Sequence, residues 1–132
     1  HDLEMIPESV ATVAYTRYVL DCGTAGDLAD LYTALAPCAL GYAEIGQRLA
    51  SDPTTKLEGN PYRSWIELYA GEKSQELAKT QGKLLDQLIG EIKPNSARRK
   101  HISEIFKTAT RMEIAFWQQA LDTSDNEVKS GK

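Results

Sequence analysis

The sequence predicts an all-α protein built as a helical bundle, and three observations lead to this prediction. Apolar residues recur at spacings of three and four over long stretches, which is the period of one face of an α-helix. No stretch alternates apolar and polar residues with the period of two that is typical of a strand. Glycine, proline and asparagine divide the chain into five such stretches, one of them short. We therefore expect five helices joined by loops of a few residues.

The first helix is predicted from about Val10 to Cys22, after an entry segment over residues 1–8. Ser9 precedes it as a suitable N-cap, and Gly23 is expected to end it. Its inner face is expected to consist of Val10, Val13, Ala14, Tyr18 and Val19.

The second helix is predicted from about Asp27, its N-cap, to Ala50. Pro37 has no N–H for the carbonyl of Thr33, so the helix should bend or loosen one turn before Cys38. Such a helix suits the wall of a pocket better than plain packing. The apolar face expected to turn inward consists of Leu28, Leu31, Leu35, Cys38, Tyr42, Ile45 and Leu49.

Three further helices complete the bundle. Asn60 is expected to cap a short helix that starts with Pro61 and ends at Tyr69. The next is predicted over residues 73–92. The last is expected over residues 97–122 after the cap Ser96, and a polar, disordered tail over residues 124–132 should follow it.

Composition excludes several classes of protein. The chain has 132 residues, 42% of them hydrophobic and 26% charged, as in an ordinary soluble domain. A net charge of −4 without a basic stripe disfavours nucleic acids and anionic membranes as partners, and no apolar run is long enough to span a membrane. Cys22 and Cys38 are too few for a disulfide framework, so we read both as free thiols in a reducing compartment. Residues 1–6 do not resemble a signal peptide, and we expect a cytoplasmic protein.

Cys38 and Tyr42 are the first candidate functional residues. Side chains four positions apart lie only about 40° apart around a helix axis, so the thiol and the phenol should stack on one inward face. Cysteine is a strong nucleophile when the thiolate is favoured. A lone cysteine on an apolar helix face is, however, more often a small core residue.

Glu113 is the second candidate, because it interrupts the apolar face of the last helix. An ionised glutamate that is buried needs a partner, a proton or a function, and burial favours the protonated form that suits a general acid. A glutamate at the edge of the face, paired with Arg111 or another cation, is the alternative. The face consists of Ile102, Ile105, Phe106, Ala109, Met112, Glu113, Phe116 and Ala120.

Other kinds of site are disfavoured. His1 is terminal and His101 lies beside Lys100, so neither histidine is placed to activate Cys38. No histidine, cysteine and carboxylate residues have the spacing of metal ligands, and no glycine-rich phosphate loop is present. We expect neither a metal nor a cofactor.

Several separated motifs, in their order along the chain, resemble the TenA family, which comprises thiaminase II and aminopyrimidine aminohydrolase. The resemblance covers most of residues 3–122 and is to the cysteine-bearing branch of the family. The motifs are Val13–Tyr18, Ala36–Cys38, Tyr42–Gly46, Asn60–Tyr62, Trp65–Gly71 and Glu113–Trp117.

This resemblance implies a haem-oxygenase-like helical fold and the hydrolysis of aminopyrimidines in thiamin salvage. The substrate would be 4-amino-5-aminomethyl-2-methylpyrimidine, and cleavage of thiamin is the related reaction. Cys38 matches the nucleophile and Glu113 the acid of the family. Four further residues match the lining of the substrate site, namely Tyr42, Tyr15, Tyr69 and Phe116. The resemblance also implies a homo-oligomer, a tetramer.

The chain departs from the family in one respect. Family members have further helices before the motifs found here, and these carry an aspartate that binds the aminopyrimidine and activates the cysteine. Residues 1–123 therefore resemble the C-terminal portion of a TenA-like domain, and the missing helices are expected as a partner, whether separate, cleaved or absent. A non-catalytic helical module that binds a pyrimidine or a protein is the alternative function, and an inert fragment is a third. Alone, the chain should bind those helices, self-associate or expose a large apolar patch.

Overall fold

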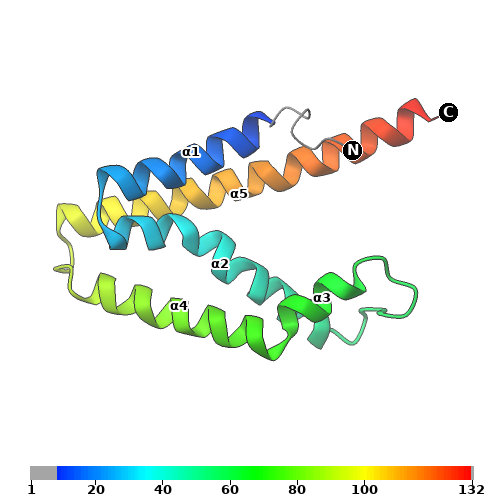
Figure 1. The fold of residues 1–132 in the computed structure, drawn as a ribbon, viewed down its shortest axis with the longest axis horizontal. Helices are drawn as coiled ribbons and strands as arrows, with labels where there is room; N and C mark the ends of the chain where they lie inside the picture. The colour runs from blue at the N-terminus through cyan, green and yellow to red at the C-terminus, as the bar shows by residue number, and fades with distance from the viewer. Residues whose placement is uncertain (1–8, 132) are drawn as a thin grey trace.

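The computed structural model describes residues 9–131, and this part of the chain folds into five α-helices without a strand (Figure 1). The all-α prediction is confirmed. The entry segment expected at residues 1–8 lies outside the described residues. The helices are α1 (Val10–Ala25), α2 (Leu28–Ser51), α3 (Arg63–Ala70), α4 (Glu72–Gly90) and α5 (Ala97–Ser130).

Helix α2 is the centre of the fold, because it packs against all four other helices. In Figure 1, α1 and α5 lie on one side of α2, α4 lies on the other, and α3 covers its C-terminal end. The face of α2 that is most buried carries small side chains, which allow neighbouring backbones to come close. The buried residues of α2 are Ala29, Asp30, Thr33, Ala34, Ala36, Ala43 and Gly46.

The predicted inner face of α2 is therefore wrong in part. Leu28, Ile45 and Leu49 are 59%, 43% and 37% exposed. Size explains the error, because the close contacts of a helix with four neighbours admit only small residues. The large apolar residues lie beside these contacts, where the described helices do not cover them.

Two predicted helix starts are confirmed. The Ser9 hydroxyl accepts from the N–H of Thr12 and caps α1. The Asp27 carboxylate accepts from the N–H groups of Ala29 and Asp30, and Asp30 accepts from the N–H of Asp27 in return, which forms a capping box on α2.

Helix α1 differs from its prediction in length and in its inner face. It continues through the glycine at position 23 to Ala25, and the N–H of Gly26 donates to the Cys22 carbonyl at its end. Val10 is 87% exposed, and Val13 is also exposed. Only Tyr18 and Val19 of the expected face pack on the core, because α5 and α2 cover that end of α1.

Helices α3 and α5 also differ from prediction. Asn60 caps a turn rather than α3, since its side-chain oxygen accepts from the N–H of Tyr62 and α3 begins at Arg63. Helix α5 continues to Ser130, where we expected disorder after residue 123. No glycine or proline interrupts this polar stretch before Gly131, and polarity alone does not end a helix.

An ion pair joins the first turns of α2 and α5. The Arg98 guanidinium donates to both carboxylate oxygens of Asp30, at 2.7 and 2.5 Å, and to Asp27 at 2.8 Å. Asp30 is buried, so its charge needs this partner. Beside it, the core cluster contains Cys22, Ala29, Ala34, Ile102 and Ile105.

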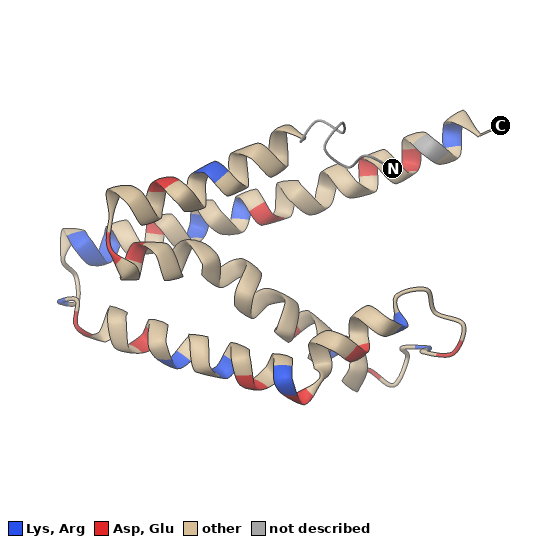
Figure 2. Ribbon diagram, in the orientation of Figure 1, with Lys and Arg blue, Asp and Glu red and all other residues tan. Residues whose placement is uncertain are grey.

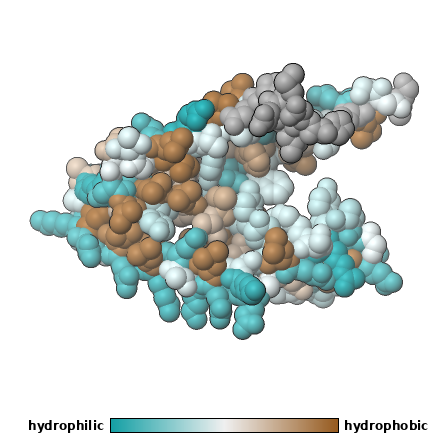
Figure 3. Space-filling view, in the orientation of Figure 1, coloured by the Kyte–Doolittle hydropathy of each residue, from teal (hydrophilic) through white to brown (hydrophobic). Residues whose placement is uncertain are grey.

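The opposite end of the molecule is less closed. Exposed apolar residues there include Ile114, Trp117 and Leu121 of α5. Figure 3 shows further hydrophobic side chains at the surface over α1, α2 and α4, and Figure 2 shows acidic and basic residues interspersed along the helices. Among the helices of residues 9–131, none combines the length and the hydropathy that a membrane span requires.

Candidate functional site

A groove of about 700 Å³ runs between the second half of α2 and the middle of α5. Its walls are mainly apolar, and Tyr42 and Glu113 are among the polar groups that they contain. The lining residues are Ala36, Pro37, Leu40, Gly41, Tyr42, Glu44, Ile45, Phe106, Thr110, Glu113, Ile114, Trp117, Gln118 and Leu121.

A hydrogen bond across this groove connects two of the predicted site residues. The hydroxyl of Tyr42 donates to Oε1 of Glu113 at 2.5 Å, although the residues are 71 positions apart. Burial, and then the nearby Glu113 carboxylate, raise the pKa of Tyr42, so its hydroxyl keeps the proton that it donates. Glu113 is therefore held by a partner on α2, and not by Arg111 as the alternative reading of the sequence proposed.

Tyr15 reaches the same region from α1. Its hydroxyl is buried and has no hydrogen-bond partner of ordinary geometry among the described residues. Burial raises the pKa of Tyr15, and the charges of Glu113 and Cys38 raise it further, so these groups lie within electrostatic reach of one another. The Tyr15 hydroxyl interacts with Glu113 but forms no well-aligned hydrogen bond, so a polar ligand atom would complete its hydrogen bonding.

Cys38 is half-buried and lies one turn before Tyr42 on α2. It faces a smaller depression beside the groove, and Ala36 and Leu40 line both. Burial, followed by the charge of Glu113, raises the pKa of the Cys38 thiol, and no described group lowers it. Cys38 thus lies within electrostatic reach of Glu113 but lines the depression and not the groove, and its surroundings favour the thiol over the thiolate. Both cysteines are free, as predicted.

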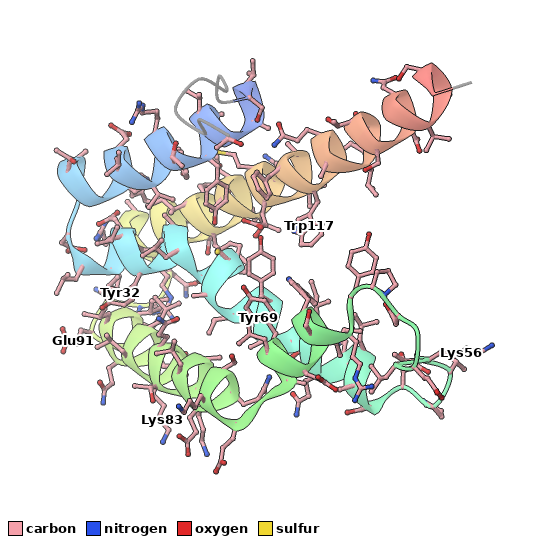
Figure 4. All side chains as sticks on the ribbon, turned by 45° about the vertical axis from the view of Figure 1, so that its right-hand side comes forward. Tyr32, Lys56, Tyr69, Lys83, Glu91 and Trp117 are labelled. Carbon is pink, nitrogen blue, oxygen red and sulfur yellow. The ribbon has the colours of Figure 1, made fainter. Side chains whose placement is uncertain are left out.

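Aromatic side chains surround Tyr42. Its ring centroid lies 5.4 Å from that of Tyr69, 6.1 Å from that of Trp65 and 5.9 Å from that of Trp117. Trp65 also contacts Tyr69 and Trp117, at 4.7 and 6.4 Å. Figure 4 shows Tyr69 and Trp117 approaching this cluster from α3 and α5. We call these four residues the aromatic cluster.

Of the six residues predicted for the site, Tyr42 and Glu113 line the groove. Cys38 lines the neighbouring depression, Tyr69 contacts the ring of Tyr42, and Tyr15 lies within electrostatic reach of Glu113. Phe116 is half-buried on α5 but is not among the residues that line the groove. Trp117, its neighbour, lies in the groove instead. Sequence reasoning missed Trp65 and Trp117 as site residues, although each is four positions from a predicted one, Tyr69 and Glu113 respectively.

The acidic and thiol side chains of the site do not form a metal centre. Among the described residues, no group of three His, Cys, Asp or Glu side chains is arranged to hold a metal ion. The site instead contains a carboxyl group and phenols suited to acid–base chemistry, and aromatic rings on which a flat ligand can stack.

Comparison with known proteins gives one family. The sequence profile described as the TENA/THI-4/PQQC family matches residues 1–123. An uncharacterized protein of Haemophilus influenzae is 50% identical over 116 residues, which are 87% of this chain and 52% of that protein. An aminopyrimidine aminohydrolase of Halalkalibacterium halodurans is 38% identical over 121 residues, 90% of this chain and 52% of that protein.

Solved structures agree. The crystal structure of a TenA family transcription regulator from Silicibacter superposes with a TM-score of 0.79 at 41% identity, covering 90% of this chain and 53% of that one. The chain thus spans about half the length of the relatives that it matches.

Proposed function

The chain belongs to the TENA/THI-4/PQQC family, and we propose that it supplies the cysteine and the acid of a site that hydrolyses aminopyrimidines in thiamin salvage. The proposed substrate is 4-amino-5-aminomethyl-2-methylpyrimidine, which with water gives the hydroxymethylpyrimidine and ammonia. Thiamin is a second candidate substrate. Support comes from the relative named aminopyrimidine aminohydrolase and from the arrangement of Cys38, Tyr42 and Glu113.

In this proposal each group of the site has one role. Glu113 takes the thiol proton as Cys38 adds to a carbon of the pyrimidine ring, and it passes that proton to the ring or to the departing amine. The amine leaves as ammonia, water takes its place, and Cys38 then leaves the ring as the thiol. Tyr42 orients Glu113 through its hydrogen bond, and Tyr15 offers the substrate a buried hydroxyl that has no well-aligned hydrogen bond of its own. Tyr69 and the rest of the aromatic cluster supply flat surfaces for the ring, while Phe116 keeps only the role that the resemblance gives it.

The observation that carries the proposal is the bond between Tyr42 and Glu113 one helical turn from Cys38. The bond supports the proposal because the carboxyl group of Glu113 and the phenol of Tyr42 come from two helices and lie near the thiol of Cys38. A structural role alone does not require a buried phenol to hold a carboxylate beside a thiol, since apolar residues of similar volume would pack there at lower cost.

Activation of Cys38 requires a group that lowers its pKa, and the described residues do not provide one. We propose that the preceding helices of TenA relatives supply it, either within the same polypeptide or as a partner. Those helices would also cover the apolar residues exposed around the groove, such as Ile45, Ile114 and Leu121. Self-association into a homo-oligomer would be another way of covering them.

A non-catalytic module that binds a pyrimidine is the second candidate. It is favoured by the raised pKa of Cys38, because a protonated thiol is a poor nucleophile but an adequate wall for a flat ligand.

Ammonia release from the aminomethylpyrimidine, together with calorimetric binding, distinguishes the two candidates. The chain is assayed alone and after addition of the N-terminal half of the Halalkalibacterium relative. We expect Cys38→Ser to abolish hydrolysis with little loss of stability, and Glu113→Gln to lower turnover strongly while binding persists. Cys22→Ser is the matched control, since Cys22 is buried in the core away from the groove. Undiminished hydrolysis by Cys38→Ser would remove the nucleophile from the mechanism, and binding without hydrolysis in every form would favour the non-catalytic module.

A further inference from the structure

Gln75, near the start of α4, joins three helices through its side chain. Its Nε2 donates to the carbonyl of Ala43 on α2 at 2.9 Å and to the carbonyl of Tyr69 on α3 at 2.8 Å. Both hydrogens of the amide are therefore engaged, one on each neighbouring helix. Ala43 directly follows Tyr42, so the two bonds reach the backbone on both sides of the contact between Tyr42 and Tyr69.

The last turn of α3 depends on these bonds. The final carbonyls of a helix lack donors within it. The hydroxyl of Ser74 donates to the carbonyl of Leu68 at 2.7 Å, and the amide of Gln75 donates to the carbonyl of Tyr69. Only Gly71 lies between α3 and α4, so the first turn of α4 caps α3 directly.

Gly46 allows the backbone of α3 to lie directly against α2. A Cβ at position 46 would lie 2.6 Å from the Cβ of Tyr69 and 2.9 Å from its carbonyl carbon. The backbone of α3 therefore rests on α2 at Gly46, while Gln75 holds it there. Tyr69 is the member of the aromatic cluster that both constraints share.

We infer that Gln75 is a positioning residue, which holds the backbone of Tyr69 against α2 and thereby fixes the aromatic cluster around Tyr42. Tyr42 in turn holds Glu113. The structural part of this inference stands on the contacts alone, and its effect on catalysis rests on the proposed function.

Few side chains other than that of glutamine could make both hydrogen bonds from position 75. A primary amide offers two donors in one plane, and asparagine is one methylene shorter. A glutamate has the same shape, but its carboxylate only accepts and would face two carbonyl oxygens. A negative charge near the start of α4 is otherwise favourable because of the helix dipole, so harm from Gln75→Glu would come from these two lost bonds.

Three variants test the inference. Gln75→Glu replaces the two donors by a carboxylate that only accepts, and Gln75→Met removes the donors without adding a charge. Gln87→Glu is the matched control, because Gln87 is exposed on the same helix. The chain has two tryptophans, both in the aromatic cluster, so near-UV circular dichroism and tryptophan emission report on it directly.

We expect both variants at position 75 to lose near-UV signal and shift the tryptophan emission to longer wavelength, with helix content retained in the far UV. Gln87→Glu should match the wild type. In hydrolytically active protein, the position 75 variants should lower kcat/KM by about 10- to 100-fold, as expected for a small misplacement of groups around the substrate.

Wild-type spectra for both variants at position 75 would overturn the positioning role, and because they are recorded without substrate they do so whatever the chain hydrolyses. If Gln75→Glu does not fold, Gln75→Met carries the test. Altered spectra with unchanged kcat/KM would overturn the link to catalysis, because the aromatic cluster would then not shape the reacting site.

Discussion

Replacing Arg98 by methionine isolates the ion pair between α2 and α5. Asp30 would keep its bond from the N–H of Asp27, but its carboxylate would lose both bonds from Arg98. The Asp30 side chain is only 2% exposed, so the charge would remain buried with only the exposed imidazole of His101, whose Nε2 lies 3.5 Å from Oδ1, in place of the guanidinium. Breaking a buried pair costs about 3–5 kcal/mol. The Arg98 side chain is 35% exposed and partly screened, so we expect a loss at the lower end, about 3 kcal/mol.

The dependence of this loss on pH follows from the sign of the pKa change. The Arg98 guanidinium, against the opposing effect of burial, holds the pKa of Asp30 well below its usual range. A carboxylate of lowered pKa adds stability at pH values above its unfolded pKa of about 3.9, and that stability is lost as the pH falls through the folded value. Without Arg98, burial instead favours protonation of Asp30. The deficit of the variant should therefore be full near neutral pH and should shrink as the pH falls to about 4.

Urea unfolding followed by far-UV circular dichroism, at about pH 7 and about pH 4, measures both effects. Arg63→Met is the matched control, because Arg63 pairs with Glu67 on the surface of α3, with both side chains more than half exposed. It should cost no more than about 0.5 kcal/mol. An Arg98→Met deficit equal to that of the control, or one that is the same at both pH values, would refute the argument.

Three further predictions concern the site. Tyr42→Phe removes the donor to Glu113 and should lower kcat/KM by about 10- to 100-fold, as expected for the loss of a hydrogen bond to a charged group. Tyr62→Phe, at an exposed residue, should leave kcat/KM unchanged, and steady-state hydrolysis compares the two variants. In a Cys22→Ser background, alkylation of Cys38 by iodoacetamide should have its pH midpoint above the ordinary thiol value of 9.0, and a midpoint below it would show an activating group that the described residues lack. Gly46→Ala should destabilise the chain by about 1–3 kcal/mol in thermal melts, because the new methyl meets Tyr69, while Gly82→Ala, which has open space, should be neutral or stabilising; equal melting temperatures would contradict the close packing of α3.

The helices themselves were predictable because their signals are local. Spacings of three and four located all five, and the carboxylate of Asp27 followed by that of Asp30 defined the start of α2. The buried face of α2 was not predictable from hydropathy. Four neighbours selected alanine, threonine and glycine for the closest contacts, and a count of apolar residues points to leucine instead.

The site was predictable as two pieces but not as a whole. The stacking of Cys38 and Tyr42 follows from one helical turn, and Glu113 is conspicuous in an apolar face. Their meeting depends on how α2 packs on α5, which no local pattern records. The same holds for the two amide bonds of Gln75 and for the pairing of Arg98 with Asp30 across 68 positions.

Arg98 attaches the beginning of the 34-residue helix α5 to α2 through its bonds to Asp30. At a rise of about 1.5 Å per residue, Glu113 lies about 22 Å along the helix from Arg98, and Leu121 lies about 35 Å from it. A tilt of α5 about Arg98 that moves Leu121 by about 3 Å would therefore move Glu113 by about 2 Å, enough to break its bond to Tyr42. An occupant of the open end of the groove that tilted α5 would therefore also change the distance between Glu113 and Tyr42.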